Sequence, residues 1–280
     1  MLRILLVIVF IVLWAPLSLH AQIDKTVTKH LNAGIKCVKA QDYEQSLVHF
    51  NNALEAAREA YPDSSMAVIA CKSQLANSYL NLHDFETSLG LFQTVAYFQK
   101  SAYGESSYEY ASQLAHIAAC YASLGSFQQA VDYCQQAVTI QEAYLDEDHL
   151  DYVFSLNSLA EYYSYNGQHK EAIETAKEVA SIVGEAWGDD GEDYITSLEF
   201  LLERYVDAED FSNARVLGQD ILKRNVAFYG DKSIQYGQAL SKMVPVYQHL
   251  DSLQTALQYA RQAMAVYKNL GGRGASVQLC

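Results

Sequence analysis

The feature that most constrains the fold of this chain is an internal repeat with a period of 42 residues. When the sequence is aligned with itself at this spacing, one column holds tyrosine in five of six copies and Cys37 in the first, a second holds mostly aromatic residues and a third only small residues. These columns are Tyr79, Tyr121, Tyr163, Tyr205 and Tyr247; Tyr43, Phe85, Phe127, His169, Phe211 and Leu253; and Ser46, Ser88, Ala130, Ala172, Ala214 and Ala256. The register continues through six copies without an insertion or deletion. Such regular spacing is typical of a chain in which each copy is one structural unit packed on its neighbours.

Each copy has the pattern of two helices. In the third copy, apolar residues recur every three or four positions over 110–121, and the same spacing returns over 127–138. Between these segments, Gly125 and Ser126 are residues that end one helix and cap the next. The chain has only 14 Gly and 3 Pro in 280 residues, too few turn-forming residues for a β-sandwich or β-barrel. The sequence therefore predicts an all-α chain of six helix pairs with no strand.

Short motifs recur within these helices. The predicted first helices carry LAEYY (159–163), IAACY (117–121) and LANSY (75–79), and the second helices begin with FQQAV (127–131) or HKEAI (169–173). These motifs resemble those of the tetratricopeptide repeat. That repeat usually has about 34 residues, and the roughly 8 extra residues here add about one turn to each helix. The longer form resembles the repeats of kinesin light chains and of many bacterial relatives.

The resemblance implies a right-handed superhelical solenoid of six antiparallel helix pairs over residues 22–270, followed by a short disordered tail at 271–280. It also implies a ligand groove lined by the first helix of each pair. Two copies depart from the pattern. The first has Gly34 and Cys37 where the others have larger residues, and the sixth has Pro245 inside its first helix. That proline is expected to kink or end the helix.

The first 21 residues have the layout of a secretory signal peptide. Arg3 supplies a positive charge, residues 4–15 form an unbroken apolar run, and Ala21 precedes the expected cleavage point. The run is shorter than the roughly 20 apolar residues of a spanning helix. We therefore expect cleavage before Gln22, with an uncleaved N-terminal anchor as the alternative. The predicted location is periplasmic or secreted, and no membrane insertion is expected after cleavage.

Composition and motifs argue against several classes of function. The formal net charge of −14 disfavours nucleic acid as a partner, because affinity for phosphate comes from Lys and Arg. No nucleotide-binding, zinc-protease or nucleophile-elbow motif is present, so the sequence predicts neither an enzyme nor a metal site nor a cofactor. The five cysteines have irregular spacing and are expected to be mostly small buried side chains. A disulfide between Cys120 and Cys134 remains an alternative.

The stripe of each first helix that lies opposite its apolar columns is the predicted ligand-contacting surface. Four carboxylates of the fourth and fifth copies fall on this stripe with hardly any Lys or Arg, which predicts an acidic patch, and two aromatic side chains could anchor a ligand. The resemblance implies that Asn157 contacts extended peptide backbone. The candidate peptide-binding residues are Asn77, Phe154, Asn157, Glu161, Tyr165, Glu199, Glu203 and Asp207. The alternative is that these are solvated polar positions without a ligand.

Two classes of function follow. The first is an exported, non-enzymatic scaffold that binds an unidentified protein or peptide, basic or neutral in charge, in its groove. The second is the N-terminal sensing part of a larger protein with a caspase-like protease or sensor kinase as its effector domain. A feature of the sixth copy favours the second class. Repeat arrays usually end in a polar capping helix, and here Tyr259, Ala263 and Val266 are expected to be half uncovered.

Overall fold

The computed structural model describes residues 25–144 and 150–277, and these residues contain helices and no strand. The predicted signal peptide lies outside the described residues. Contacts between Cα atoms divide the chain into two compact units, 1–144 and 145–280, each of which is described by itself. No helix in the described ranges is long and apolar enough to cross a membrane. The prediction of an all-α fold built from helix pairs is confirmed.

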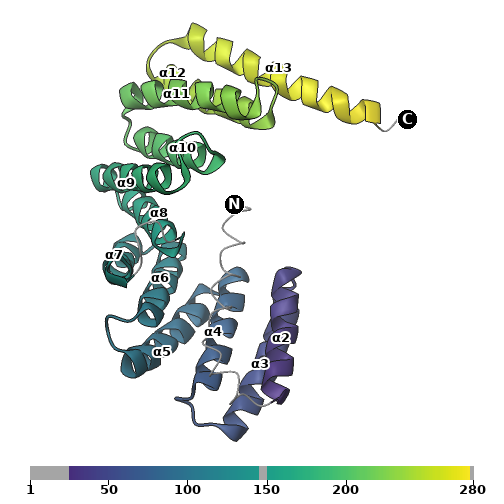
Figure 1. Cartoon of the computed structure of the whole chain (residues 1–280), viewed down its shortest axis with the longest axis vertical. Helices are drawn as coiled ribbons and strands as arrows, with labels where there is room; N and C mark the ends of the chain where they lie inside the picture. Colours follow the sequence, from purple (N-terminus) through teal and green to yellow (C-terminus); the bar gives the residue numbers. More distant parts are fainter. Residues whose placement is uncertain (1–24, 145–149, 278–280) are drawn as a thin grey trace. The chain divides into compact units, whose positions relative to one another are not determined.

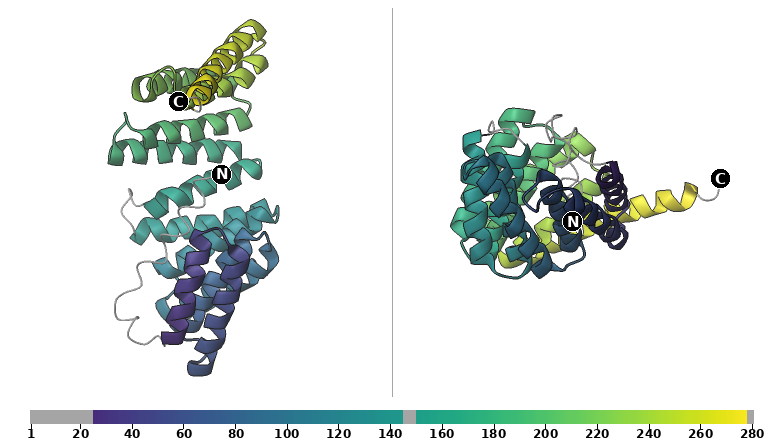
Figure 2. Two further views of the ribbon diagram at one scale, coloured as in Figure 1. Left: turned by 90° about the vertical axis from the view of Figure 1, so that its right-hand side faces the viewer. Right: turned by 90° about the horizontal axis from the view of Figure 1, so that it is seen from below.

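In the ranges that the structure describes, each unit holds three consecutive helix pairs (Figure 1, Figure 2). In the first unit the helices are α2 (Lys25–Lys39), α3 (Tyr43–Ala60), α4 (Met66–Asn81), α5 (Phe85–Tyr103), α6 (Tyr108–Ser123) and α7 (Phe127–Tyr144). In the second unit they are α8 (Leu150–Tyr165), α9 (His169–Trp187), α10 (Glu192–Asp207), α11 (Phe211–Tyr229), α12 (Ile234–His249) and α13 (Leu253–Val277). Even-numbered helices are the first helices of the six copies and odd-numbered helices are the second.

The turn inside each helix pair repeats with the 42-residue period, and so does the sign of one backbone φ angle. One residue per copy takes a positive φ just before the second helix, and four of the six are not glycine. They are Gln41, His83, Gly125, Gly167, Glu209 and Asp251. The residue that follows is often an acid whose side chain accepts a hydrogen bond from the backbone N–H three positions on: Asp42, Asp84 and Asp210 are examples. Such a cap satisfies one of the donors that a helix start leaves unpaired.

The small column and the tyrosine column hold the two helices of a copy together. All six residues of the small column are buried, so the helix backbones can approach closely there. The tyrosines lie between helices: Tyr121 stacks on Tyr133, and Tyr247 stacks on Tyr259, at ring-centroid distances of 5.3 and 5.2 Å. Tyr163 is 7% exposed. These two columns form the packed interior that the periodicity predicted.

The first copy has glycine at position 34 because the residue that faces it, Phe50, is large. A Cβ atom added to Gly34 would lie 2.4 Å from the Phe50 ring, which is fully buried. In the second copy the same two columns hold Ala76 and Phe92, which share one buried cluster. The small residue at Gly34 is therefore needed to make room for the phenylalanine on the next helix.

Three expectations about the sixth copy need correction. Pro245 neither ends nor divides α12, which continues from Ile234 to His249. A proline removes one backbone N–H, and this single missing donor is tolerated within one turn of the helix end. Helix α13 continues through 271–277, where a disordered tail was predicted, because glycine lowers helix propensity by only about 1 kcal/mol and no proline intervenes. Residues 278–280 lie outside the described range.

The third correction concerns the end of the array. Of the three residues expected to be half uncovered, Tyr259 is half-buried, whereas Ala263 and Val266 are buried against α12, at 4% and 8% exposure. The exposed apolar residues of α13 lie on another side of the helix, at Leu253, Leu257 and Met264.

Candidate binding face

In the second unit, the first helices α8, α10 and α12 lie side by side and are joined by polar contacts. The Ser164 hydroxyl on α8 donates a hydrogen bond of 2.8 Å to Asp207 on α10. Lys242 on α12 donates one of 2.9 Å to Glu199 on α10. We use the term binding face for the residues on this side of the three helices. They are Phe154, Asn157, Glu161, Ser164, Tyr165, Glu199, Glu203, Arg204, Asp207 and Lys242.

The two aromatic residues of the binding face are accessible. Phe154 is 36% exposed and Tyr165 is 56% exposed, although both are on a helix that is otherwise largely buried. The Tyr165 hydroxyl donates a hydrogen bond of 2.9 Å to Glu161, one turn earlier on α8. This hydrogen bond, together with the negative charge of Glu161, raises the pKa of Tyr165. The ring is thereby fixed along the helix surface with one side open to solvent.

Lys242 is the centre of the acidic patch. Its ammonium group lies 2.9 Å from Glu199 and 3.0 Å from Glu203, so one cation from α12 bridges two carboxylates of α10. Burial alone would lower the pKa of Lys242, but the two carboxylates outweigh it and the pKa is raised. The lysine is therefore charged at neutral pH. The expectation that hardly any Lys or Arg accompanies these acids is wrong at this point.

Asp207 is also paired with a cation. Arg204, three residues earlier on α10, places its Nη2 atom 3.0 Å from the Asp207 carboxylate. The arginine is only 7% exposed, and its guanidinium lies 4.6 Å from the centroid of the Phe200 ring. The Nε and Nη1 atoms of Arg204 have no hydrogen-bond partner among the described residues. The binding face thus holds four carboxylates and two cations, and it remains acidic.

Comparison with known proteins identifies the fold. A family model described as tetratricopeptide repeat matches residues 108–185. A search of curated proteins found no match. A putative kinesin light chain from Podosopora anserina with nearly identical TPR-like repeats has a solved structure similar to this one. Its TM-score is 0.67 at 18% identity, covering 72% of this chain and 95% of that chain.

Residues 108–185 match the tetratricopeptide repeat, and the described helices have the fold of a tetratricopeptide-repeat array. The structure of BtubC from P. vanneervenii is similar over 89% of this chain and 94% of that chain, with a TM-score of 0.62 and 14% identity. A Rap protein complexed with competence and sporulation factor is similar over 88% of this chain and 76% of that chain, with a TM-score of 0.55 and 11% identity. At these identities the likeness concerns the fold. The repeats are of the 42-residue, kinesin-light-chain-like type that the sequence predicted.

The repeat register explains why two residues of the binding face were missed. Arg204 occupies a column whose members in the second, third, fourth and sixth copies are buried, at Ser78, Cys120, Tyr162 and Val246. Its position therefore predicted a core residue and not a partner of Asp207. Lys242 lies one position after Ser241, which is in the same 42-residue column as Glu199 and Asn157. An offset of 43 residues relates Lys242 to Glu199 and Asp207 to Ser164, and this offset was the available signal.

The two amide residues of the predicted site, Asn77 and Asn157, differ in their exposure. Asn77 lies on α4 in the first unit, where it is 9% exposed and its Oδ1 atom has no hydrogen-bond partner among the described residues. It is therefore more enclosed than a solvated stripe position would be. Asn157 is half-buried on α8, on the same helix as Phe154 and Glu161. Ligand contact by either amide stays a prediction.

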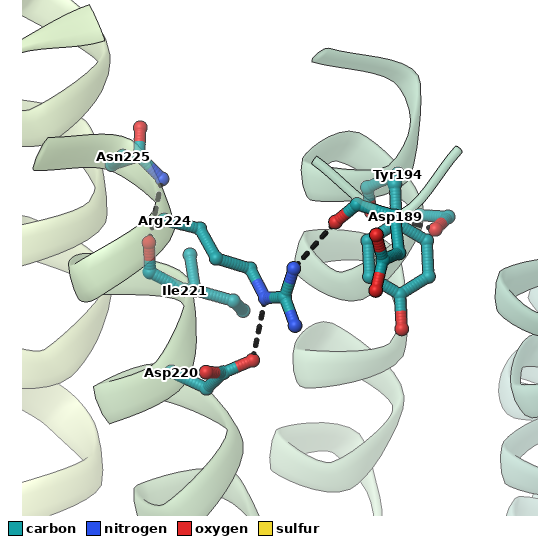
Figure 3. Close-up of polar contacts among 7 residues, drawn as sticks. Asp189, Tyr194, Asp220, Ile221, Arg224 and Asn225 are labelled. Atoms are coloured by element: carbon teal, nitrogen blue, oxygen red, sulfur yellow. Dashed lines mark hydrogen bonds and ion pairs between the residues drawn. The ribbon is translucent and has the colours of Figure 1, made fainter. Parts of the chain in front are cut away.

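A separate polar cluster in the second unit has a structural role (Figure 3). Arg224 on α11 lies between Asp220, one turn earlier on the same helix, and the loop before α10. Its Nε atom donates a hydrogen bond of 2.7 Å to Asp220, and its Nη1 atom donates one to the Asp189 carbonyl oxygen. The guanidinium also lies 5.0 Å from the centroid of the Tyr194 ring. These contacts fix the loop at 188–191 against α11.

The remaining reactive residues do not form a site within the described ranges. No group of three or more His, Cys, Asp or Glu residues there could hold a metal ion. Cys120 and Cys134 are both buried and neither is in a disulfide, so the alternative of a disulfide between them is wrong. Burial raises the pKa of the Cys71 and Cys134 thiols to about 12. Cys280 lies outside the described residues.

Proposed function

We propose that this protein is a non-enzymatic interaction scaffold whose binding face on α8, α10 and α12 takes an extended protein segment. The observation that carries the proposal is the combination on one surface of two accessible aromatic side chains with a fixed row of charged groups. Aromatic side chains supply contact area, and charged groups select partners and steer them. The similar Rap protein was solved in complex with competence and sporulation factor, which agrees with peptide binding by this fold.

The partner we propose is basic or neutral, as the stripe predicted, with a modest contribution from charge. Lys242 and Arg204 balance part of the charge of the four carboxylates. Glu161 is paired only with a hydroxyl group in the described contacts, and the side chain of Glu203 is 50% exposed. A basic side chain of the ligand therefore has these two carboxylates to bind. The apolar contacts at Phe154 and Tyr165 carry most of the affinity.

The test is a selection from a random peptide library displayed on phage, with the full chain as bait. We expect the selected peptides to combine apolar residues with Lys or Arg. The Phe154→Ala and Tyr165→Ala variants should weaken binding by about tenfold. The Glu199→Lys, Glu203→Lys double variant should slow association and flatten its salt dependence.

A matched control is available on α3. Glu55 and Glu59 are both exposed and have the same four-residue spacing as Glu199 and Glu203. The Glu55→Lys, Glu59→Lys double variant changes the net charge equally and should leave binding unchanged. Peptides that bind equally well to the variants on α8 and α10 would show that the ligand contacts another surface.

We also propose that the protein is exported, with cleavage before Gln22. The support is the charged, apolar and small-residue order of the first 21 residues. N-terminal sequencing of the protein from fractionated Gram-negative cells should give Gln22 as the first residue, in the periplasmic or secreted fraction. An intact N-terminus in the membrane fraction would instead favour the uncleaved anchor. The sensing part of a larger protein, our alternative function, would use the same binding face.

A further inference from the structure

Helix α13, the second helix of the last copy, has an exposed apolar face. Leu253, Leu257 and Met264 are 68%, 50% and 65% exposed, and their spacing of four and seven residues places them on one stripe. Tyr267, 38% exposed, lies at the edge of this stripe next to α12, where its hydroxyl is 3.3 Å from the Ser241 hydroxyl. We call Leu253, Leu257, Met264 and Tyr267 the open face of α13.

The position of Met264 is buried in four of the earlier copies. The column of Met264 includes Leu54, Ala96, Ala180 and Leu222, which are 8%, 5%, 6% and 9% exposed. In these copies the second helix packs against the first helix of the next copy: α3 contacts α4, α5 contacts α6, α9 contacts α10 and α11 contacts α12. Met264 therefore has the register of a residue that the first helix of a following copy covers.

The column that contains Arg261 indicates which side chain a helix bound to α13 would present to it. In three copies, one polar residue of the second helix reaches the tyrosine of the next first helix, 28 positions later. Gln93 donates a hydrogen bond to the Tyr121 hydroxyl, Gln219 donates one to the Tyr247 hydroxyl, and the Lys177 ammonium lies 5.7 Å from the centroid of the Tyr205 ring. The residue of α13 at this position is Arg261, which is exposed. An arginine here can bind the face of an aromatic ring.

The charge of α13 limits which kind of helix can bind to its open face. Residues 253–277 contain no Asp or Glu, and Arg261 and Lys268 are both exposed on one side of the open face. In a chain of net charge −14 this helix is locally basic. The first helix of another copy of this chain, α2, carries Lys25, Lys29, Lys36 and Lys39 and no acid. Head-to-tail contact between α13 and α2 would therefore place like charges together.

We propose that the open face of α13 binds an acidic amphipathic helix of another protein, which presents an aromatic side chain to Arg261. The apolar residues of that helix cover Leu257 and Met264, and its carboxylates lie beside Lys268. This site is separate from the binding face on α8, α10 and α12, and it is independent of the function proposed above.

The probe is a fluorescent peptide with the sequence of residues 192–207, which form α10. It is an acidic amphipathic helix with Tyr205 at the required position, and in the protein it packs on the equivalent face of α9. In a titration with the full chain, we expect binding that weakens about tenfold in the Leu257→Gln, Met264→Gln double variant. Arg261→Ala in the protein and Tyr205→Ala in the peptide should each weaken binding, and together should cost less than the sum of the two changes.

Controls separate this site from nonspecific binding. Val216→Gln on α11 changes an apolar residue that is 61% exposed and lies off the open face, so peptide affinity should not change. A basic peptide with the sequence of residues 25–39 should not bind. The proposal is overturned if the peptide binds equally to the double variant, or if the basic peptide binds as well as the acidic one. Self-association of the chain that Met264→Gln abolishes would also overturn it, because the occupant would then be a second copy.

Discussion

At the scale of single residues, two tyrosines two positions apart on α8 have opposite environments. Tyr163 is 7% exposed and Tyr165 is 56% exposed. We expect Tyr163→Ala to lower the free energy of unfolding by about 3–5 kcal/mol, because a large aromatic side chain leaves a packed interior. Tyr165→Ala should cost less than about 1 kcal/mol. Urea unfolding of both variants measures the difference, and equal losses would contradict the assigned helix faces.

Arg204 is itself buried, in a column that is also buried in four other copies, and its carboxylate partner among the described residues is Asp207. Removing that carboxylate leaves a buried cation without a counter-ion. Asp207→Asn should therefore lower the free energy of unfolding by on the order of 2 kcal/mol, a value reduced for the partial exposure of Asp207. Arg204→Met should be neutral or stabilising within about 1 kcal/mol. If Arg204→Met is instead the more destabilising change in chemical unfolding, the arginine contributes more than its burial costs.

The raised pKa values of two buried thiols, Cys71 and Cys134, predict how the stability and the thiol reactivity of the protein depend on pH. Because burial raises the pKa of Cys71 and Cys134 to about 12, both remain protonated in the folded protein at pH 8. We expect a thiol reagent to modify them only after unfolding, since the thiolate is the reactive form. The unfolded thiols ionise near pH 9, so these two groups favour the folded state below that pH. Their stabilisation is lost as the pH rises from about 9 to about 12. Mass spectrometry of the labelled cysteines gives the order of modification.

At the scale of elements, the helix pairs tolerate variation in sequence because facing residues compensate one another in volume. Gly34 makes room for Phe50, and a Cβ added at Gly218 would lie only 2.1 Å from the Met243 sulfur. We expect Gly34→Ala to lower the free energy of unfolding by about 1–3 kcal/mol through overpacking against the Phe50 ring.

The corresponding control is a second change on the facing helix. Adding Phe50→Leu to Gly34→Ala should recover part of the lost stability, because the smaller side chain makes room for the methyl group. Phe50→Leu alone should be destabilising, since it leaves a cavity beside glycine. If the two changes are additive in thermal unfolding, the two helices do not approach closely at this point.

At the scale of the whole molecule, the chain consists of two units with separate cores. In repeat proteins each copy contacts mainly its neighbours, so the effect of a core change stays near its site. Phe92 is fully buried in the first unit. We expect Phe92→Ala to increase amide hydrogen exchange in α4, α5 and α6 much more than in α12 and α13. An equal increase throughout the chain would mean that the two units unfold as one.

Most of the fold could be predicted because each tetratricopeptide repeat is specified locally. Helix length, the position of the turn and the identity of the packed columns all depend on residues within one 42-residue copy or its neighbour. The difference at Pro245 arises because a single missing donor near a helix end costs less than ending the helix. The apolar residues expected to be uncovered at 263 and 266 are buried because each faces its own partner helix, α12.

The sequence by itself determined the helix pairs, their period and the stripe that carries Glu161, Glu199, Glu203 and Asp207. Only the tertiary structure decided how those charges are paired. Lys242 comes from the next first helix, whereas Arg204 pairs with Asp207 one turn away on α10 itself. The physical reason is reach: a long charged side chain can leave the column of its own Cα atom and bind a carboxylate on a neighbouring helix. The periodicity of the sequence determines where each backbone position lies. The packing of neighbouring helices determines which partner the charged group of a long side chain contacts.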